Sequence, residues 1–133
     1  MSEKISGIIN SQSAPEPVGA YPHARKVGEF LFLSGVGPRQ KGTDVIPGVS
    51  PHDIAIQTQA VIDNVGMILE ASGSSLQNVV DIQVFLTNMQ RDFQGFNQVY
   101  NKTFQDIGPT RTTIEVGSLP TPIAVEFKVI ALA

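Results

Sequence analysis

Cysteine is absent from the 133-residue chain, and this excludes disulfides, thiolate nucleophiles and cysteine-ligated zinc or iron–sulfur sites. Histidine is scarce, because only His23 and His52 occur. Two histidines are too few for a self-contained histidine metal site unless carboxylates or other subunits contribute ligands. The plausible catalytic groups are therefore Arg, Glu, Asp, Tyr, Ser, Thr and backbone amides.

Long apolar runs and basic clusters are missing too. No stretch approaches the roughly 18 to 20 apolar residues that a membrane span needs, and residues 1–5 lack the apolar core of a signal peptide. We therefore expect a cytoplasmic protein. The net charge is −3 and no run of Lys or Arg occurs, which argues against nucleic-acid and anionic-membrane partners.

The chain does hold enough apolar material for one domain over residues 1–133, since 41% of its residues are hydrophobic. A short β-prone segment at 5–9 leads into a polar, Pro-rich loop. Residues 20–25 and 29–34 then predict a hairpin whose turn uses Gly28.

The clearest helix start follows the hairpin and a Gly/Pro-rich loop. The continuous apolar run at 30–33 first predicts a strand covered on both faces. Ser50 can then cap a helix, Pro51 suits its first position, and Asp53 favours the positive end of the helix dipole. Gly73 is a natural end for this helix.

The second half of the chain predicts one more helix and three strands. Residues 80–86 alternate in polarity and predict a strand with one mostly apolar face. Residues 112–116 and 124–132 predict the last two strands. A helix ending near Gly108 is indicated by apolar residues at helical spacing, namely Phe93, Phe96, Val99 or Tyr100, and Phe104.

This order predicts an α+β fold with a mixed sheet of about six strands and two helices on one face. The second face also needs cover, and the alternating apolar residues of the last strand leave two alternatives open. They either face outward and drive self-association, most simply into a closed ring, or face the helices and leave the other side polar. The residues concerned are Val125, Phe127, Val129 and Ala131.

Arg111 and Glu126 are the strongest candidates for chemistry. A strand-entry arginine such as Arg111 can hold a carboxylate by two parallel charge-assisted hydrogen bonds, although a surface or salt-bridging arginine is the alternative. Glu126 lies within an apolar strand, so an inward orientation would raise its pKa toward the range useful for proton transfer. The alternative is an exposed strand face that Glu126 shares with Lys128.

Several short motifs add to these two residues. They are Gly19-Ala20-Tyr21, Leu33-Ser34-Gly35, Gln57-Thr58-Gln59-Ala60 with Asn64, Asn78-Val79-Val80, Val84-Phe85-Leu86, Asp92-Phe93, Asn97-Gln98-Val99-Tyr100, Gly108-Pro109-Thr110-Arg111-Thr112-Thr113 and Leu119-Pro120 leading to Val125-Glu126. Through these motifs the chain resembles the RidA (YjgF) family of enamine and imine deaminases over nearly its whole length. The Pro-x-Arg-Thr element with a glutamate 15 residues after the arginine is the most specific of them.

The resemblance implies a chorismate-mutase-like fold in a trimeric ring with active sites at subunit interfaces. It implies a cofactor-free and metal-free hydrolase acting on C–N bonds, with Arg111 clamping the substrate carboxylate and Glu126 activating water and moving protons. The remaining pocket residues would be Tyr21, Ser34, Gly35, Asn97 and Thr113. The reaction implied is hydrolysis of an imine or enamine acid to an oxo acid and ammonia.

Within the family, the chain looks more like the 2-aminomuconate deaminase branch than like other members. The motifs that carry this likeness are Gly-Pro-Thr-Arg-Thr-Thr, Tyr-Pro-His and Glu-Phe-Lys. The longer dicarboxylate of that branch would want a second cation, for which His23, Arg39 and Lys41 are candidates. Small 2-imino acids such as 2-iminobutanoate or 2-iminopropanoate are the alternative substrates. The competing roles are a non-catalytic carboxylate-binding or chaperone-like module and, against the charge argument, an endoribonuclease.

Overall fold

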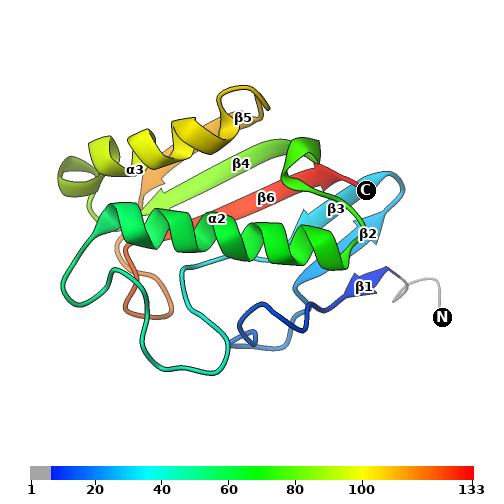
Figure 1. The fold of residues 1–133 in the computed structure, drawn as a ribbon, viewed down its shortest axis with the longest axis horizontal. Coiled ribbons are helices and arrows are strands. Elements are labelled where there is room, and N and C mark those ends of the chain that lie inside the picture. Colours follow the sequence, from blue (N-terminus) through cyan, green and yellow to red (C-terminus); the bar gives the residue numbers. More distant parts are fainter. Residues whose placement is uncertain (1–6) are drawn as a thin grey trace.

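The computed structural model describes residues 7–133, which form a six-stranded sheet with two long helices packed against it (Figure 1). The strands follow the order β1-β2-β3-β6-β4-β5, and only the β4–β5 pair is parallel. The strand bounds are β1 Ile8–Ile9, β2 Ala24–Val27, β3 Phe30–Leu33, β4 Val79–Leu86, β5 Thr110–Glu115 and β6 Val125–Leu132. The helix bounds are α2 Ile54–Ala71, the 3-10 turn η1 Leu76–Asn78, and α3 Met89–Phe104. The predicted α+β fold is confirmed.

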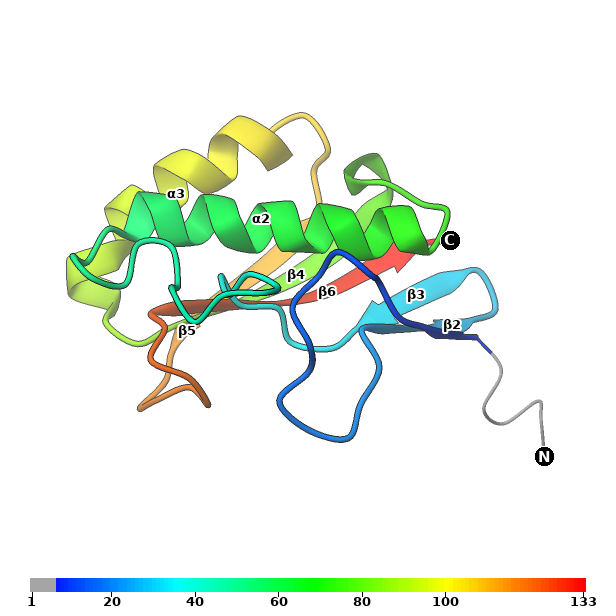
Figure 2. The same ribbon diagram turned by 60° about the horizontal axis from the view of Figure 1, so that its bottom comes forward.

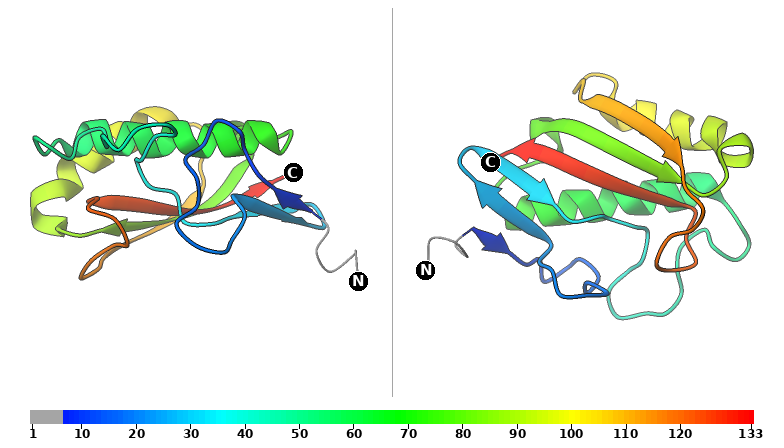
Figure 3. Two further views of the ribbon diagram at one scale, coloured as in Figure 1. Left: turned by 90° about the horizontal axis from the view of Figure 1, so that it is seen from below. Right: turned by 180° about the vertical axis from the view of Figure 1, so that it is seen from behind.

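Both long helices cover the same face of the sheet, as Figure 2 and the edge-on view of Figure 3 show. On α3, Phe96, Tyr100 and Phe104 recur every four residues and therefore share the face that looks inward. Their rings pack on one another and on Phe127 of β6, with ring centroids 4.8 to 6.2 Å apart. This aromatic cluster joins α3 to the centre of the sheet.

The last strand settles which face its apolar residues occupy. Val125, Phe127, Val129 and Ala131 are all fully buried and belong to the core beneath the helices. These residues therefore face the helices, as the second alternative expects, and do not themselves drive self-association. The polar opposite side that this alternative expects is not found, because Phe30 and Phe32 are exposed there. Glu126, Lys128 and Ile130 occupy the opposite side of β6, which we call the open face of the sheet.

The open face is not covered by any segment of residues 7–133, as the rear view in Figure 3 shows. Phe30 and Phe32 lie on it and are 43% and 40% exposed, whereas Leu31 and Leu33 are fully buried under α2. The expectation that residues 30–33 are covered on both faces is therefore wrong for the single chain. A continuous apolar run indicates two apolar faces, but it does not indicate what covers the second.

The first long helix begins later than its sequence predicts. Ser50 and Pro51 lie in a turn joined by a cis peptide bond, and α2 begins at Ile54 with Asp53 as its N-cap. The Asp53 carboxylate accepts a hydrogen bond from the amide of Ile56 at 3.2 Å. The expected cap, Ser50, was wrong. Both Ser50 and Asp53 suit the N-cap position, and the helix uses Asp53.

The predicted hairpin is confirmed, with Gly28 between β2 and β3 at a φ of 59°, a conformation that favours glycine. Of the strand predicted at 5–9, Ile8 and Ile9 pair with β2, and residues 5 and 6 lie outside the described residues. No helix within residues 7–133 is long and apolar enough to cross a membrane. The expected cytoplasmic location stays a prediction.

Candidate functional site

Glu126 lies in a small pocket near the start of β6. The pocket lining, which we call the Glu126 pocket, includes Tyr21, Gly35 and Arg39 together with part of the 120–123 loop. These residues come from four separate segments of the chain. The sheet brings them together because Val36, just after β3, bridges to Phe127 of β6 in antiparallel register.

Gly35 leaves the space that the Glu126 carboxyl occupies. A Cβ atom at position 35 would lie 2.5 Å from Oε2 of Glu126, so any larger residue would push the carboxyl aside. Ser34, next in the chain, is held by a hydrogen bond of 2.7 Å from its hydroxyl to the Pro22 carbonyl. Together these contacts fix the end of β3 against the carboxyl-bearing side chain.

The Glu126 carboxyl is electrostatically unusual. Burial raises its pKa above the ordinary value of 4.5. Among residues 7–133 no Lys, Arg or His nitrogen lies within 4 Å of its oxygens. A half-buried carboxyl with a raised pKa and no ion partner is a candidate for proton transfer.

Tyr21 and His23 flank this pocket in different ways. Tyr21 is partly exposed, lines the Glu126 pocket, and accepts a hydrogen bond from the amide of Val18 at 3.3 Å. His23 is buried, and its two ring nitrogens contact the Ser11 amide at 2.9 Å and the Pro15 carbonyl at 2.8 Å. These partners require Nδ1 to accept and Nε2 to donate, so His23 holds the 11–15 loop in place as a neutral ring.

Arg111 lies elsewhere, between β5 and α3. Its Nη1 donates a hydrogen bond of 2.8 Å to Oδ1 of Asn97, and its guanidinium carbon lies 4.6 Å from the ring centre of Tyr100. Phe96 and Phe93 approach it at 5.3 and 5.9 Å. We call these three rings the aromatic platform of Arg111, since each presents a π system to the cation.

Most hydrogen-bond donors of the Arg111 guanidinium are not used by the described residues. No carboxylate of residues 7–133 lies within 4 Å of it, and the hydrogen bond to Asn97 uses only one of its five N–H groups. Close by, Oγ1 of Thr113 and the hydroxyl of Tyr100 are buried without a hydrogen-bond partner among the described residues. An anion placed here would meet several unsatisfied donors.

The single chain separates these residues into two groups. Arg111 pairs with Ile82 of β4 and Thr113 pairs with Val84, so both point to the helix side of the sheet. Glu126 pairs with Phe85 on the open face. The structure therefore brings Tyr21, Gly35 and Glu126 together, with Ser34 beside them, and separately brings together Asn97, Arg111 and Thr113.

Two features of the site were not predicted from the sequence. The aromatic platform could have been found from the helical spacing of Phe93, Phe96, Asn97 and Tyr100, which places them on the α3 face nearest β5. Lys128, two residues after Glu126 on the open face, donates a hydrogen bond to the Leu33 carbonyl, and burial lowers its pKa. Nothing in the alternating pattern of β6 indicates that interaction.

Comparison with known proteins shows which family this chain resembles. Residues 11–133 match the family model described as Endoribonuclease L-PSP. A RutC family protein of Saccharolobus solfataricus is 41% identical over 124 residues, which cover 93% of this chain and 95% of that protein. A protein of Dermatophagoides farinae named 2-iminobutanoate/2-iminopropanoate deaminase is 32% identical and covers 94% of each chain.

Solved structures agree with this result. The crystal structure of E. coli TdcF with bound serine has a TM-score of 0.85 at 32% identity and covers 95% of this chain and 98% of that one. The E. coli YjgF gene product has the same TM-score at 30% identity, with coverage of 96% and 98%. The chain belongs to the RidA/YjgF/RutC family, whose sequence model carries the L-PSP description.

Proposed function

We propose that this protein hydrolyses 2-imino acids, or the enamines in equilibrium with them, to 2-oxo acids and ammonia. The observation that carries the proposal is the presence of two complementary groups of residues. One is a half-buried carboxyl with a raised pKa in a pocket, and the other is an arginine without a carboxylate partner among the described residues. A carboxylate-bearing imine needs both.

Each residue has a definite part in this reaction. Arg111 binds the substrate carboxylate through two parallel hydrogen bonds, with Asn97 and the aromatic platform holding the guanidinium in orientation. Glu126 takes a proton from water as the oxygen attacks the C=N carbon and forms a carbinolamine. Glu126 returns this proton to the nitrogen, which becomes the NH2 group of the carbinolamine. Glu126 then takes the carbinolamine hydroxyl proton and delivers it to the same nitrogen as the C=O bond forms and the C–N bond breaks, so that ammonia leaves with the 2-oxo acid as the second product.

We further propose that the two groups meet between subunits of a trimeric ring. Within one chain they occupy opposite faces of the sheet, so a neighbouring copy would have to supply the missing group. The open face carries a set of exposed apolar side chains suited to such an interface. They include Val27, Phe30, Phe32, Ile114 and Leu132.

The relatives guide the choice of substrate. One relative is named for 2-iminobutanoate and 2-iminopropanoate, and the TdcF structure has serine bound to that protein. The names of these relatives give no support to the 2-aminomuconate deaminase branch that the sequence motifs favoured. We therefore take 2-iminobutanoate as the first substrate to test. The L-PSP description favours a ribonuclease, but a net charge of −3 is unfavourable for binding a phosphate backbone.

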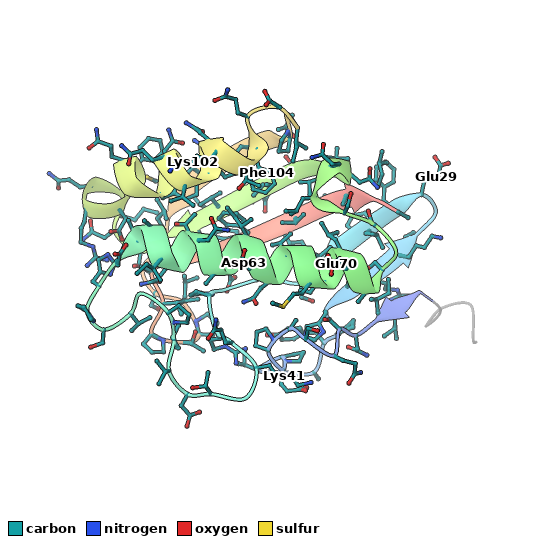
Figure 4. The ribbon with its side chains drawn as sticks, viewed as in Figure 1. Glu29, Lys41, Asp63, Glu70, Lys102 and Phe104 are labelled. Atoms are coloured by element: carbon teal, nitrogen blue, oxygen red, sulfur yellow. The ribbon has the colours of Figure 1, made fainter. Side chains whose placement is uncertain are left out.

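The test measures ammonia release from 2-iminobutanoate generated in situ, above the spontaneous rate. We expect Arg111→Ala to lower kcat/KM about 100-fold or more, because the substrate loses its anchor and its orientation. Lys102→Ala, which removes an exposed cation from α3, the helix that carries Asn97 and the aromatic platform, is the control and should keep full activity (Figure 4).

Two outcomes would contradict the proposal. Full activity in Arg111→Ala would overturn the assignment of the carboxylate clamp. A wild-type protein that binds small carboxylates but releases no ammonia from the imine would instead favour the non-catalytic binding module.

A further inference from the structure

Arg39 is a second arginine beside the Glu126 carboxyl, and the proposed reaction has not used it. It follows β3 in the chain and lines the Glu126 pocket together with Tyr21 and Gly35. It also lines an adjoining small pocket, which shares those two residues and adds Ser34 and His23. Arg39 therefore lies where the two pockets meet.

The backbone at this position is fixed from the core. Asn64 of α2 is buried, and its side-chain amide donates hydrogen bonds to the carbonyls of Gly37 at 2.9 Å and Arg39 at 2.7 Å. A buried amide that binds two carbonyls two residues apart limits how far that loop can move. Arg39 is thus presented by a fixed backbone rather than by a free loop.

The guanidinium of Arg39 has unused donors. Its Nη2 donates one hydrogen bond of 2.9 Å to the Glu16 carbonyl. No carboxylate of residues 7–133 lies within 4 Å of it, although a guanidinium offers five N–H groups. It is partly buried, so part of its solvation has already been lost and a carboxylate ligand would compensate.

The other cations near the site are less suited to bind substrate. Lys41 donates to the Gln12 carbonyl at 2.6 Å, lies 3.7 Å from Glu16, and does not line the Glu126 pocket. Both ring nitrogens of His23 are occupied by backbone groups. Lys128 donates to the Leu33 carbonyl and does not line the pocket either. Of the three candidate second cations in the sequence, only Arg39 combines position with free donors.

We propose that Arg39 binds a second carboxylate at the far end of the substrate, so that the preferred substrates are 2-imino dicarboxylates. The inference rests on the proposed imine hydrolysis at the same site. Arg111 would hold the carboxylate next to the C=N bond, Glu126 would act at the C=N carbon, and Arg39 would hold the distal carboxylate. Two arginines at opposite ends fix both the length and the direction of a substrate.

The test compares 2-iminobutanoate with 2-iminoglutarate, which is one carbon longer and carries a carboxylate on the carbon that forms the terminal methyl group of the first. We expect the wild type to prefer 2-iminoglutarate in kcat/KM, and Arg39→Gln to reduce that preference about 30-fold, the effect of losing a charge-assisted pair. A general folding defect would lower both rates together and leave the ratio unchanged. Lys41→Gln, in the same loop but outside the pocket, is the matched control and should keep the wild-type ratio (Figure 4).

A binding measurement separates this inference from the proposed function. Titration with 2-oxoglutarate and 2-oxobutanoate should show that Arg39→Gln weakens binding of the dicarboxylate selectively. An unchanged preference in both assays would overturn the role of Arg39 while leaving imine hydrolysis intact. If neither imine is hydrolysed, the proposed function fails, and the titration alone decides whether Arg39 binds a distal carboxylate.

Discussion

Glu126 lies on β6 where burial raises the pKa of its carboxyl above 4.5, and no cation of residues 7–133 lies within 4 Å to offset that effect. A raised carboxyl pKa means that the folded protein binds the proton more tightly than the unfolded chain does. The contribution of Glu126 to stability is therefore greatest at acid pH. It falls as the pH rises from 4.5 through the raised value.

Glu126→Gln is expected to lose imine hydrolysis and to gain stability relative to the wild type at neutral pH. Glutamine is neutral, so its stability does not fall over the pH range in which the buried carboxyl ionises. Urea unfolding at pH 4 and pH 7 should show the difference between variant and wild type growing with pH. Glu70→Gln, an exposed position on α2, is the matched control and should show no such divergence (Figure 4). A difference that is the same at both pH values would contradict the assigned burial.

The sequence singled out Arg111 and Glu126 but not their relation to each other. Alternation along a strand predicts which residues share a face, but it does not predict which face meets the helices. Register decides that question, because Arg111 pairs with buried Ile82 and Glu126 pairs with Phe85 on the open face. Neither pairing can be obtained from local sequence, since β4 is separated in the chain from both β5 and β6.

Among the elements, the helices show where local sequence is sufficient and where it is not. The aromatic stripe of α3 predicted that helix well, because its periodicity and its burial agree. The predicted start of α2 was wrong because Ser50 and Asp53 are both good N-cap residues. Contacts from elsewhere select the later start, since the amide of Asp53 and the side chain of Gln57 both donate to the Gly48 carbonyl.

A buried charged group, Asp92, connects the segment before α2 to α3. Asp92 is 1% exposed and accepts hydrogen bonds from His52 at 2.8 Å and from Arg91 at 2.9 and 3.0 Å. Burial on its own would raise the pKa of Asp92, but the hydrogen bonds and positive charges of Arg91 and His52 outweigh it and lower the pKa. The pair His52–Asp92 thus connects the segment before α2 to the first turn of α3.

Asp92→Ala is expected to lower the free energy of unfolding by about 2 kcal/mol, because two donors lose their shared acceptor and a buried side chain is removed. Urea unfolding at neutral pH measures the effect. Asp63→Ala, on the exposed side of α2, is the control and should change stability by less than about 0.5 kcal/mol (Figure 4). Equal effects of the two substitutions would show that the His52–Asp92–Arg91 contacts do not stabilise the fold.

At the scale of the whole molecule, the open face explains the one strand whose burial the sequence overestimated. Phe30 and Phe32 make residues 30–33 apolar on both sides, yet the single chain buries only Leu31 and Leu33. In the proposed ring a neighbouring copy would cover the two phenylalanines. The composition of this strand would then reflect the assembly and not the isolated chain, which is why single-chain burial cannot be predicted from it.

The ring also predicts that two inactive variants can restore each other. Arg111→Ala keeps an intact Glu126, and Glu126→Gln keeps an intact Arg111. If each site takes one group from each of two subunits, random mixing after equal co-expression should make about a quarter of the sites complete, with a corresponding return of ammonia release. A site built within one chain would always carry one of the two substitutions and would stay inactive.

The control for this experiment replaces one partner by the double variant. Arg111→Ala co-expressed with a chain carrying both substitutions has no source of Arg111, so its activity should stay at the level of either variant alone. Recovery in the first mixture and not in the second would place Arg111 and Glu126 of one site on different subunits. No recovery in mixed trimers of confirmed composition would mean that the two faces of the sheet do not meet across an interface, and the shared site would have to be abandoned.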